Sequence, residues 1–346
     1  MIPVAVLTGF LGSGKTTLLA RLLRDPAMAR TAVIINEFGA IGLDHDLIET
    51  SDESFVQLSN GCLCCNVRSD LLLTLGDLAA RRLAGTVPPF ERVVIETTGL
   101  ADPAPILHAL MTDRGVCEQY ALDGVVATVD TVAGLATLDR HPEALRQAAV
   151  ADRLVLTKTD LPGAQAAAIG ARLARLNPGA TQLTAVSGAI APAALFDCGP
   201  YGTAGKHPDV HAWLASEAIA AAGAHARHLH QDEIGTFCIV RDAPLRGAAL
   251  ALLLSALAEN CGDRLLRMKG IVRVAERPER PAVIHGVQHV YHAPVWLARW
   301  PSEDRRTRLV FIGRNIRETW VRSLVDLIEA EVEDETSRRG GDGSTD

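Results

Sequence analysis

A glycine-rich loop near the amino terminus constrains the fold of this chain more than any other feature. Residues 9–16 read GFLGSGKT; the apolar run VAVL precedes them at 4–7, and residues 17–23 have helical apolar spacing. Glycines let successive backbone N–H groups surround phosphate oxygens, and the amino terminus of the following helix adds donors and partial positive charge. The strand, loop and helix together predict a P-loop nucleotide-binding domain.

Each polar side chain of this loop has an expected role at a bound nucleotide. Lys15 is expected to reach the β- and γ-phosphates, and Thr16 to offer its hydroxyl to Mg²⁺. The predicted phosphate-binding residues are Gly9, Gly12, Ser13, Gly14, Lys15, Thr16 and Thr17. A flexible glycine turn is the alternative, and the flanking strand and helix patterns argue against it.

Composition favours a cytoplasmic protein of two domains. The chain has 346 residues, 48% of them apolar, and a net charge of −7, so we expect two cores and no nucleic acid as the main partner. The first strand begins almost at Met1 and no apolar run is long enough to span a membrane, so we expect neither a signal peptide nor membrane insertion. Seven cysteines, three of them within four positions, indicate reduced thiols or metal ligands rather than disulfides.

The first domain is predicted to have an α/β fold. Residues 1–197 alternate strand and helix patterns, and several strands read as continuous apolar runs, which is typical of strands buried on both faces. We therefore expect a P-loop NTPase domain with a mostly parallel sheet and helices on both faces. Its expected strands include 32–36, 92–96, 124–130, 153–157 and 182–186.

The rest of the chain changes character. Residues 198–232 carry scattered glycine, proline and histidine, and are expected to be an interdomain linker. Residues 233–330 predict a smaller α+β domain with helices on one face of a sheet. Its expected strands lie at 236–241, 271–275, 283–290 and 308–313, and its expected helices at 245–259 and 316–331. Residues 331–346, acidic and then rich in glycine and serine, predict a disordered tail.

Two further motifs follow predicted strands of the first domain. In TKTD at 157–160, the Asp160 carboxylate can accept two hydrogen bonds from guanine but would stay unsatisfied against adenine. The stem of Lys158 can lie along the base plane, so Thr157, Lys158 and Asp160 are the predicted base-binding residues. A solvated turn is the alternative. The sequence VSGA at 186–189 is expected to supply a backbone N–H to guanine O6.

In RVVIETTG at 92–99, an apolar strand ends in an acid. Glu96 is expected to orient Mg²⁺ or its waters, and Gly99 to let a backbone N–H approach the γ-phosphate. With Lys15 and Thr16, Glu96 completes the predicted catalytic set. A surface cap at the end of the strand is the alternative for Glu96.

Three cysteines gather in the sequence GCLCCN at 61–66. Thiolates bind Zn²⁺ and other soft or borderline metals, and three ligands leave one coordination position open, which suits transient metal holding. Cys62, Cys64 and Cys65 are therefore predicted metal ligands; buried apolar cysteines and a redox pair are the alternatives. Glu37, in NEFG at 36–39, is a further candidate ligand or part of a nucleotide-responsive segment.

In this order, the motifs resemble those of the CobW-like GTPases, metallochaperones related to the GTPases that assist nickel delivery to urease and hydrogenase. The sequence LLRMKG at 265–270 and LVFIG at 309–313 extend the resemblance to the family's second domain. The resemblance implies a GTPase that binds a transition metal, zinc by default, and couples its transfer to a metal-requiring client protein to GTP hydrolysis. It implies GTP, Mg²⁺ and Zn²⁺ or another transition metal as cofactors.

Residue by residue, the resemblance places Cys62, Cys64 and Cys65 on the family's metal cysteines, and Lys15, Thr16 and Glu96 on its phosphate and Mg²⁺ residues. Two departures stand out. Thr157 replaces an Asn that many GTPases have, which implies weaker guanine contacts or a weaker brace to the P-loop. The dense histidine tract of many members is here reduced to His225, His228 and His230, with His207 and His211 upstream.

Two alternative functions stay open at this point. A P-loop phosphotransferase is disfavoured by Asp160 and by the lack of an evident Arg-rich lid. A GTP-binding zinc sensor with little turnover is the second alternative, because no residue is obviously placed to orient the attacking water. For a GTPase, the missing part of the hydrolytic site is expected to come from a partner protein or from a second copy of the chain in a homodimer.

Overall fold

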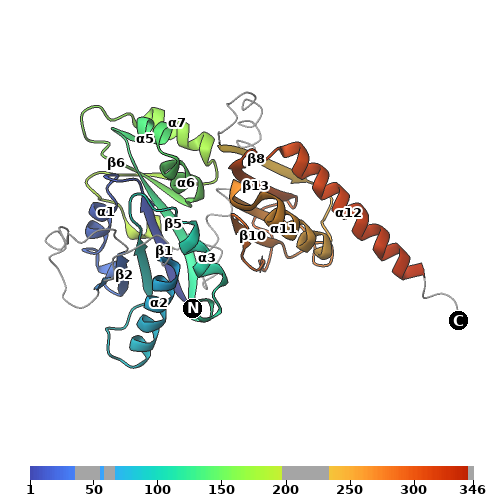
Figure 1. Ribbon diagram of the computed structural model, residues 1–346, viewed down its shortest axis with the longest axis horizontal. Coiled ribbons are helices and arrows are strands. Elements are labelled where there is room, and N and C mark those ends of the chain that lie inside the picture. Colours follow the sequence, from blue (N-terminus) through green and yellow to red (C-terminus); the bar gives the residue numbers. More distant parts are fainter. Residues whose placement is uncertain (36–54, 58–66, 197–233, 342–346) are drawn as a thin grey trace. The chain divides into compact units, whose positions relative to one another are not determined.

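The computed structural model describes residues 1–35, 55–57, 67–196 and 234–341 (Figure 1). The chain forms two compact units, Met1–Asp209 and Val210–Asp346. The division falls within the segment 198–232 that the sequence predicts as the linker, all of which lies outside the described residues.

The first unit is built on a parallel sheet, as predicted. Its described strands are β1 (Ile2–Gly9), β2 (Thr31–Ile35), β3 (Phe55–Gln57), β4 (Arg92–Glu96), β5 (Tyr120–Asp130), β6 (Arg153–Thr157) and β7 (Thr181–Ala185). They follow the order β3-β2-β4-β1-β5-β6-β7, and every pairing is parallel. Because β1 lies between β4 and β5, the P-loop that follows β1 is flanked by the carboxyl ends of both strands.

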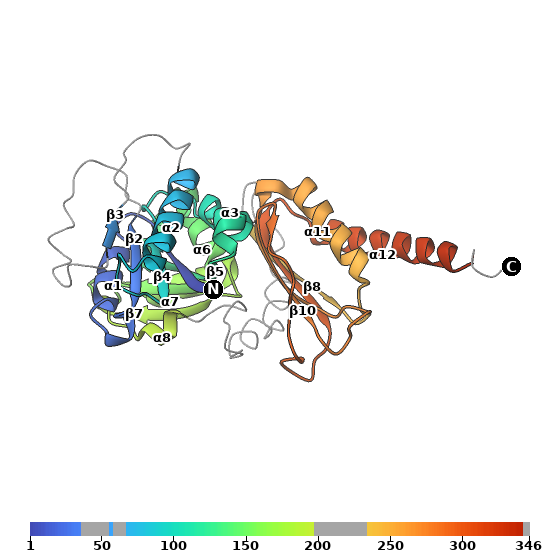
Figure 2. The same cartoon turned by 90° about the horizontal axis from the view of Figure 1, so that it is seen from below.

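Helices cover both faces of this sheet. They are α1 (Lys15–Leu22), the 3-10 turn η1 (Pro26–Met28), α2 (Val67–Leu83), α3 (Ala104–Thr112), α4 (Arg114–Cys117), α5 (Gly134–Arg140), α6 (Pro142–Val150), α7 (Ala166–Leu176) and α8 (Pro192–Leu195). On one face, Leu18 and Leu22 of α1 and Leu195 of α8 share a core with alternate residues of the strands, among them Leu7 and Val126. Figure 2 shows α2 and α3 on the side of the sheet opposite α8.

The second unit is an antiparallel sheet with helices on one face. Its strands are β8 (Ile234–Arg241), β9 (Leu265–Val272), β10 (Ala282–Val287), β11 (Val290–Tyr291), β12 (Val295–Trp296) and β13 (Thr307–Arg314). The order is β11-β10-β9-β13-β8, with β12 pairing β10. The helical elements are α11 (Gly247–Cys261), η3 (Gly262–Arg264) and α12 (Glu318–Gly341). Leu253 of α11 and Val325 of α12 pack into one core with Phe237, Met268 and Phe311, so both helices cover the same face.

The end of the chain differs from the prediction. Helix α12 continues to Gly341, so residues 331–341 are helical rather than disordered, and only 342–346 lie outside the described residues. Val332 is buried, and Arg338 pairs with Asp334 one turn earlier at 2.6 Å. The charge-rich composition that suggested disorder therefore supplies helix-stabilising pairs at i, i+4 spacing. None of the helices in the described ranges combines the length and the apolarity needed to cross a membrane.

Candidate functional site

The P-loop leaves β1 with a backbone that only glycine can follow. Gly9 has φ 142°, and a Cβ atom at this position would lie 2.3 Å from Oγ1 of Thr128 on β5. Gly14, also at positive φ, is the N-cap of α1, which begins at Lys15. The loop therefore closes tightly against β5, and the first free N–H groups of α1 point out of the carboxyl edge of the sheet.

The side chain of Lys15 folds back over the loop. Its Nζ donates to the carbonyl oxygens of Gly9 at 2.9 Å and Phe10 at 3.3 Å, and the residue is buried. These bonds hold the ammonium group inside the curve of the loop, where the predicted phosphate oxygens would approach.

Two neighbouring strands brace the P-loop through hydroxyl groups. Ser13 Oγ lies 2.6 Å from Oγ1 of Thr128 on β5. Thr157, the last residue of β6, donates from Oγ1 to the carbonyl oxygen of Ser13 at 2.7 Å. The brace that Thr157 was expected to weaken, by replacing an Asn, is thus made by the threonine hydroxyl itself. All three groups are buried, so leaving one unpaired would cost stability.

Thr16 and Glu96 form the pair expected at a Mg²⁺ site. Leu7 of β1 is in register with Glu96 of β4, which places the carboxylate beside the start of α1. Thr16 Oγ1 donates to Glu96 Oε1 at 2.7 Å, and Glu96 is only 4% exposed. A hydroxyl and a carboxylate are hard oxygen ligands of the kind that Mg²⁺ prefers, so the residues present fit this ion.

The loop after β4 lies directly against the P-loop. A Cβ atom on Gly99 would lie 2.6 Å from the backbone N of Leu11, so a larger residue would push the two loops apart. On its other side, Gln147 of α6 donates from Nε2 to the carbonyl oxygens of Gly99 at 3.2 Å and Ala101 at 3.0 Å. Sequence reasoning identified Gly99 but missed Gln147, which stands in an alanine-rich helix and belongs to no motif.

The TKTD sequence has an acidic partner that the sequence did not reveal. Lys158 has a left-handed backbone, φ 56°, and its Nζ lies 2.7 Å from Oδ2 of Asp130, the last residue of β5. Asp130 also accepts from the N–H groups of Val132 and Ala133. Burial opposes the charge of Asp130, but these hydrogen bonds outweigh it and hold its pKa below the ordinary value. Asp160, two residues after Lys158, is exposed to solvent.

The loop after β7 also reaches this edge of the sheet. Ser187 and Gly188 both have positive φ, and a Cβ atom on Gly188 would lie 2.8 Å from the carbonyl oxygen of Thr17 in α1. The VSGA segment predicted to face guanine O6 therefore lies against the first turn of the helix that follows the P-loop.

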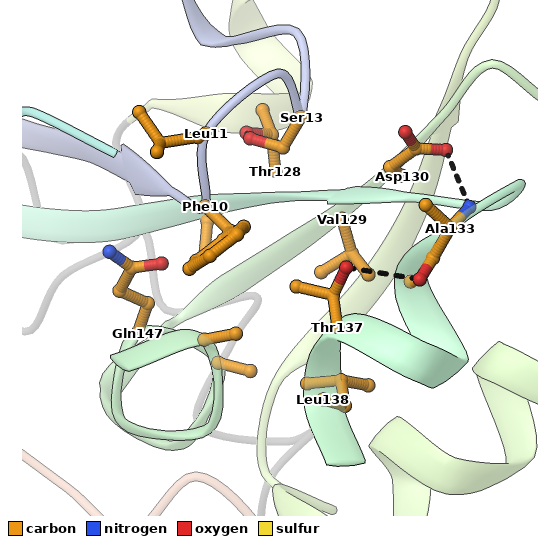
Figure 3. A pocket seen from close by; sticks show the side chains of 14 residues that line it. Phe10, Leu11, Ser13, Thr128, Val129, Asp130, Ala133, Thr137, Leu138 and Gln147 are labelled. Atoms are coloured by element: carbon orange, nitrogen blue, oxygen red, sulfur yellow. Dashed lines mark hydrogen bonds between the residues drawn. The ribbon is translucent and has the colours of Figure 1, made fainter. Parts of the chain in front are cut away.

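A cavity of about 90 Å³ opens beside the P-loop, between it and helices α5 and α6 (Figure 3). Phe10 enters it from the loop, and its ring stacks on His141 with the ring centroids 4.5 Å apart. Most of its wall is apolar. Ser13, Thr128, Asp130, Thr137 and Gln147 supply its polar side chains.

The predicted transition-metal ligands Glu37, Cys62, Cys64 and Cys65 lie outside the described residues, as do the linker histidines. Across the described ranges, no group of three or more His, Cys, Asp or Glu side chains could hold a metal ion. The described cysteines, Cys117, Cys238 and Cys261, have free thiols. Burial raises the pKa of each thiol, that of Cys238 to about 11, which makes the thiolate form less favourable.

Together, the fold and this edge of the sheet define a P-loop nucleotide-binding protein. The parallel sheet brings the loops after β1, β4, β5, β6 and β7 to one edge, where binding sites of open α/β sheets form. The lysine, the threonine–acid pair and the glycine-rich backbone meet there, and their chemistry fits a nucleoside triphosphate with Mg²⁺.

Residues 3–184 match the model of the CobW/HypB/UreG nucleotide-binding domain, and residues 234–328 match that of the cobalamin synthesis protein cobW C-terminal domain. The chain belongs to the CobW/HypB/UreG family, which confirms the resemblance drawn from its motifs.

Similar proteins cover both units. The zinc chaperone YjiA of Escherichia coli is 34% identical over 93% of this chain and 97% of its own length. A crystal structure of Zn(II)-bound YjiA GTPase aligns over 94% of this chain and 98% of its own, with 29% identity and a TM-score of 0.68. The zinc chaperone CobW of a Sinorhizobium species is 31% identical over 94% of this chain and 97% of its own length.

Proposed function

We propose that this protein is a GTP-hydrolysing zinc chaperone that passes the metal to a client protein as its nucleotide state changes. The observation that carries the proposal is the hydrogen bond between Thr16 and the buried Glu96 beside the P-loop, in a chain that matches the family over both of its domains. The names of the relatives, a zinc chaperone and a Zn(II)-bound GTPase, support the choice of cargo and reaction.

At the phosphates, each residue has a separate task. Lys15 binds the β- and γ-phosphate oxygens, for which it exchanges its bonds to the carbonyls of Gly9 and Phe10. Thr16 and Glu96 would hold Mg²⁺, which when bound neutralises charge on the phosphate oxygens. The N–H of Gly99 faces the γ-phosphate, so the loop after β4 senses whether that group is present.

At the base, Asp160 gives specificity for guanine. Its carboxylate accepts from guanine N1–H and from the amino group at position 2, which adenine lacks. The bond between Lys158 and Asp130 anchors the end of the lysine side chain, so that its stem is held straight for contact with the base plane. Thr157 keeps the P-loop and this base-binding segment in a fixed relation through its bond to Ser13.

The cargo site is the cysteine loop. Cys62, Cys64 and Cys65 bind zinc as thiolates, with Glu37 as a further ligand, and the open coordination position lets a ligand of the client enter before the protein's own ligands leave. This chemistry needs reduced thiols, so we place the protein in the cytoplasm. The client is a protein that requires the metal. The partner that completes the hydrolytic site is either this client or a second copy of the chain in a homodimer.

The experiment that tests the proposal measures phosphate release by the purified chain from GTP and from ATP, with and without zinc. We expect turnover of GTP to exceed that of ATP, with weaker selectivity than in proteins that have Asn in place of Thr157. Asp160→Asn is expected to weaken GTP binding by about 2–4 kcal/mol while improving the relative binding of xanthosine triphosphate. Equal use of ATP and GTP would contradict the base assignment. Transfer of phosphate to an added acceptor would support a phosphotransferase instead, and binding of GTP and zinc without turnover would support a sensor.

A further inference from the structure

Helix α6 carries a buried amide on a face that is otherwise apolar. Gln147 follows Ala144 at i+3 and precedes Ala148, both of which are buried with it, and Gln147 itself is 1% exposed. Its Nε2 donates to the carbonyl oxygens of Gly99 and Ala101. The helix thus makes two hydrogen bonds to the loop that links the Mg²⁺ acid, Glu96, to α3.

Stability alone does not account for this glutamine. Its Oε1 is buried and has no hydrogen-bond partner among the described residues, and Figure 3 shows the amide beside Phe10 at the edge of the cavity. Burial of an unpaired oxygen opposes folding, so this half of the amide group is a cost to stability. What the amide supplies, and methionine or leucine would not, is a pair of donors to the loop.

The loop also needs such an anchor. Gly99 lacks a Cβ atom, so only its contacts restrict its backbone. On one side it lies against Leu11 of the P-loop. On the other side, Gln147 holds its carbonyl oxygen. Arg146 of the same helix lies with its Nη1 3.7 Å from Oδ2 of Asp102, whose Oδ1 accepts from the N–H of Ala104, the first residue of α3. Helix α6 therefore contacts the loop at Gly99, Ala101 and Asp102.

We propose that Gln147 is a positioning residue for the γ-phosphate. It fixes the carbonyl oxygens of Gly99 and Ala101 against α6, and the N–H of Ala101 in turn donates to the carbonyl oxygen of Thr98 at 3.1 Å. Because the Thr98 carbonyl shares one peptide plane with the N–H of Gly99, that N–H is already oriented when GTP arrives. This preorganisation favours GTP over GDP, because only GTP has the group that this N–H meets. The inference rests on the proposed role of Gly99 at the γ-phosphate.

The test compares Gln147→Met with the wild type, because methionine keeps the length and packing of the side chain but donates no hydrogen bond. Affinities for GDP and for a non-hydrolysable GTP analogue are measured with Mg²⁺, together with kcat and thermal stability. We expect about a tenfold loss of affinity for the analogue and a similar fall in kcat, with GDP affinity close to the wild type. Thermal stability should fall somewhat, because two carbonyl oxygens lose their donor, and this fall is compared with that of the control variant. Arg146→Met, at a partly exposed position, is expected to change the same ratio by about twofold.

The matched control is Gln182→Met. Gln182 makes the same kind of bond, from Nε2 to the carbonyl oxygen of Gly170 at 3.0 Å, but between β7 and α7, and we expect no change in either affinity. An equal loss for GDP and the analogue in Gln147→Met, or no loss for either, would overturn the inference.

A second variant separates this inference from the proposed function. Gly99→Ala is expected to lower analogue affinity, because its Cβ atom collides with Leu11. If Gly99→Ala loses the preference for the analogue and Gln147→Met keeps it, the role of Gly99 stands and that of Gln147 is wrong. If the wild type itself binds no GTP analogue, the proposed function fails first.

Discussion

The two sheets of this chain use their loops in opposite ways. In the parallel sheet, the loops after β1, β4, β5, β6 and β7 all leave at one edge, and polar groups from distant parts of the sequence meet there. In the antiparallel sheet, successive loops leave at opposite ends, so its loop side chains are spread over the unit. Parallel topology concentrates chemistry at one edge, whereas antiparallel topology distributes it.

The polar contacts of the two units reflect this difference. Those of the first unit that surround the P-loop are buried or partly buried and join different strands and helices, as in the bonds of Thr157 to Ser13 and of Thr16 to Glu96. In the second unit many charged pairs are exposed and local, such as Arg322 with Glu318 one turn earlier. Exposed local pairs contribute little to stability, so the second unit depends mainly on its apolar core.

The largest expected effect is at the P-loop lysine. Lys15→Ala removes the only ammonium group that we assign to the β- and γ-phosphates, and we expect nucleotide affinity to fall by at least about 100-fold. The fold should persist, because the bonds from Lys15 to the carbonyl oxygens of Gly9 and Phe10 stay within the loop itself. Calorimetric titration with GDP measures the affinity, and circular dichroism checks the fold. Normal GTP binding and hydrolysis by this variant would show that the P-loop assignment is wrong.

The second unit is expected to respond to core changes in stability and not in nucleotide affinity. Leu257 of α11 is fully buried in the core that α11 and α12 form with the sheet, so Leu257→Ala should cost about 2–5 kcal/mol of unfolding free energy. Urea unfolding, followed by tryptophan fluorescence, measures the cost. A fall in GDP affinity in the folded protein, with stability unchanged, would contradict the division of labour between the two units.

The brace between β6 and the P-loop should give an intermediate effect. Thr157→Val keeps the shape of the side chain but leaves the carbonyl oxygen of Ser13 without this donor, at a cost of about 1–3 kcal/mol in stability. Because the brace ends in the P-loop, we expect GDP affinity to fall as well. Thr157→Asn is the informative companion: a gain in preference for GTP over ATP would show that threonine weakens base recognition while it preserves the brace.

The smallest effect concerns acid. The folded-state pKa of Asp130 is lowered, so its pair with Lys158 stabilises the native state above the unfolded-state pKa, and this stability is lost as pH falls below about 4 through the folded-state value. Urea unfolding at neutral and at acidic pH, for the wild type and Asp130→Asn, measures it. The variant should lose less stability between the two pH values. An equal or larger loss of stability in the variant would show that the Asp130–Lys158 pair does not contribute to the acid sensitivity of the fold.

Local patterns in the sequence predicted much of the first unit. The bounds of β4 and β6 agree with the expected ranges, and those of β2 and β7 agree to within one residue. Strand β5 begins at Tyr120, four residues before the expected start. The sequence pattern missed these residues because Asp123, which is buried, interrupts the apolar run. Strand β9 begins at Leu265, whereas the expected strand began at 271. The charged residues Arg267 and Lys269 interrupt its apolar run in the same way, although they alternate with apolar residues.

The candidate site was predictable only where its residues belong to a motif. Lys15, Thr16 and Glu96 have fixed positions relative to a strand end, so spacing identified them. Thr128, Asp130 and Gln147 enter the site through tertiary packing, as with the bond between Ser13 and Thr128, which spans 115 residues of sequence. Asp130 ends a predicted strand, and that position was a usable signal. Gln147 offered none, because an amide in a helix is ordinary until the helix is placed against a loop.

The measurement that tests the central claim most directly is a zinc competition titration of the full chain in GDP and in a non-hydrolysable GTP analogue. If nucleotide state controls the cysteine loop, zinc affinity should be higher with the analogue by about 5–150-fold, a coupling of roughly 1–3 kcal/mol. Linkage then requires zinc to tighten binding of the analogue, relative to GDP, by the same factor. The difference should vanish when Cys62, Cys64 and Cys65 are changed to Ser. Identical zinc affinity in the two nucleotide states would contradict transfer driven by the GTP cycle.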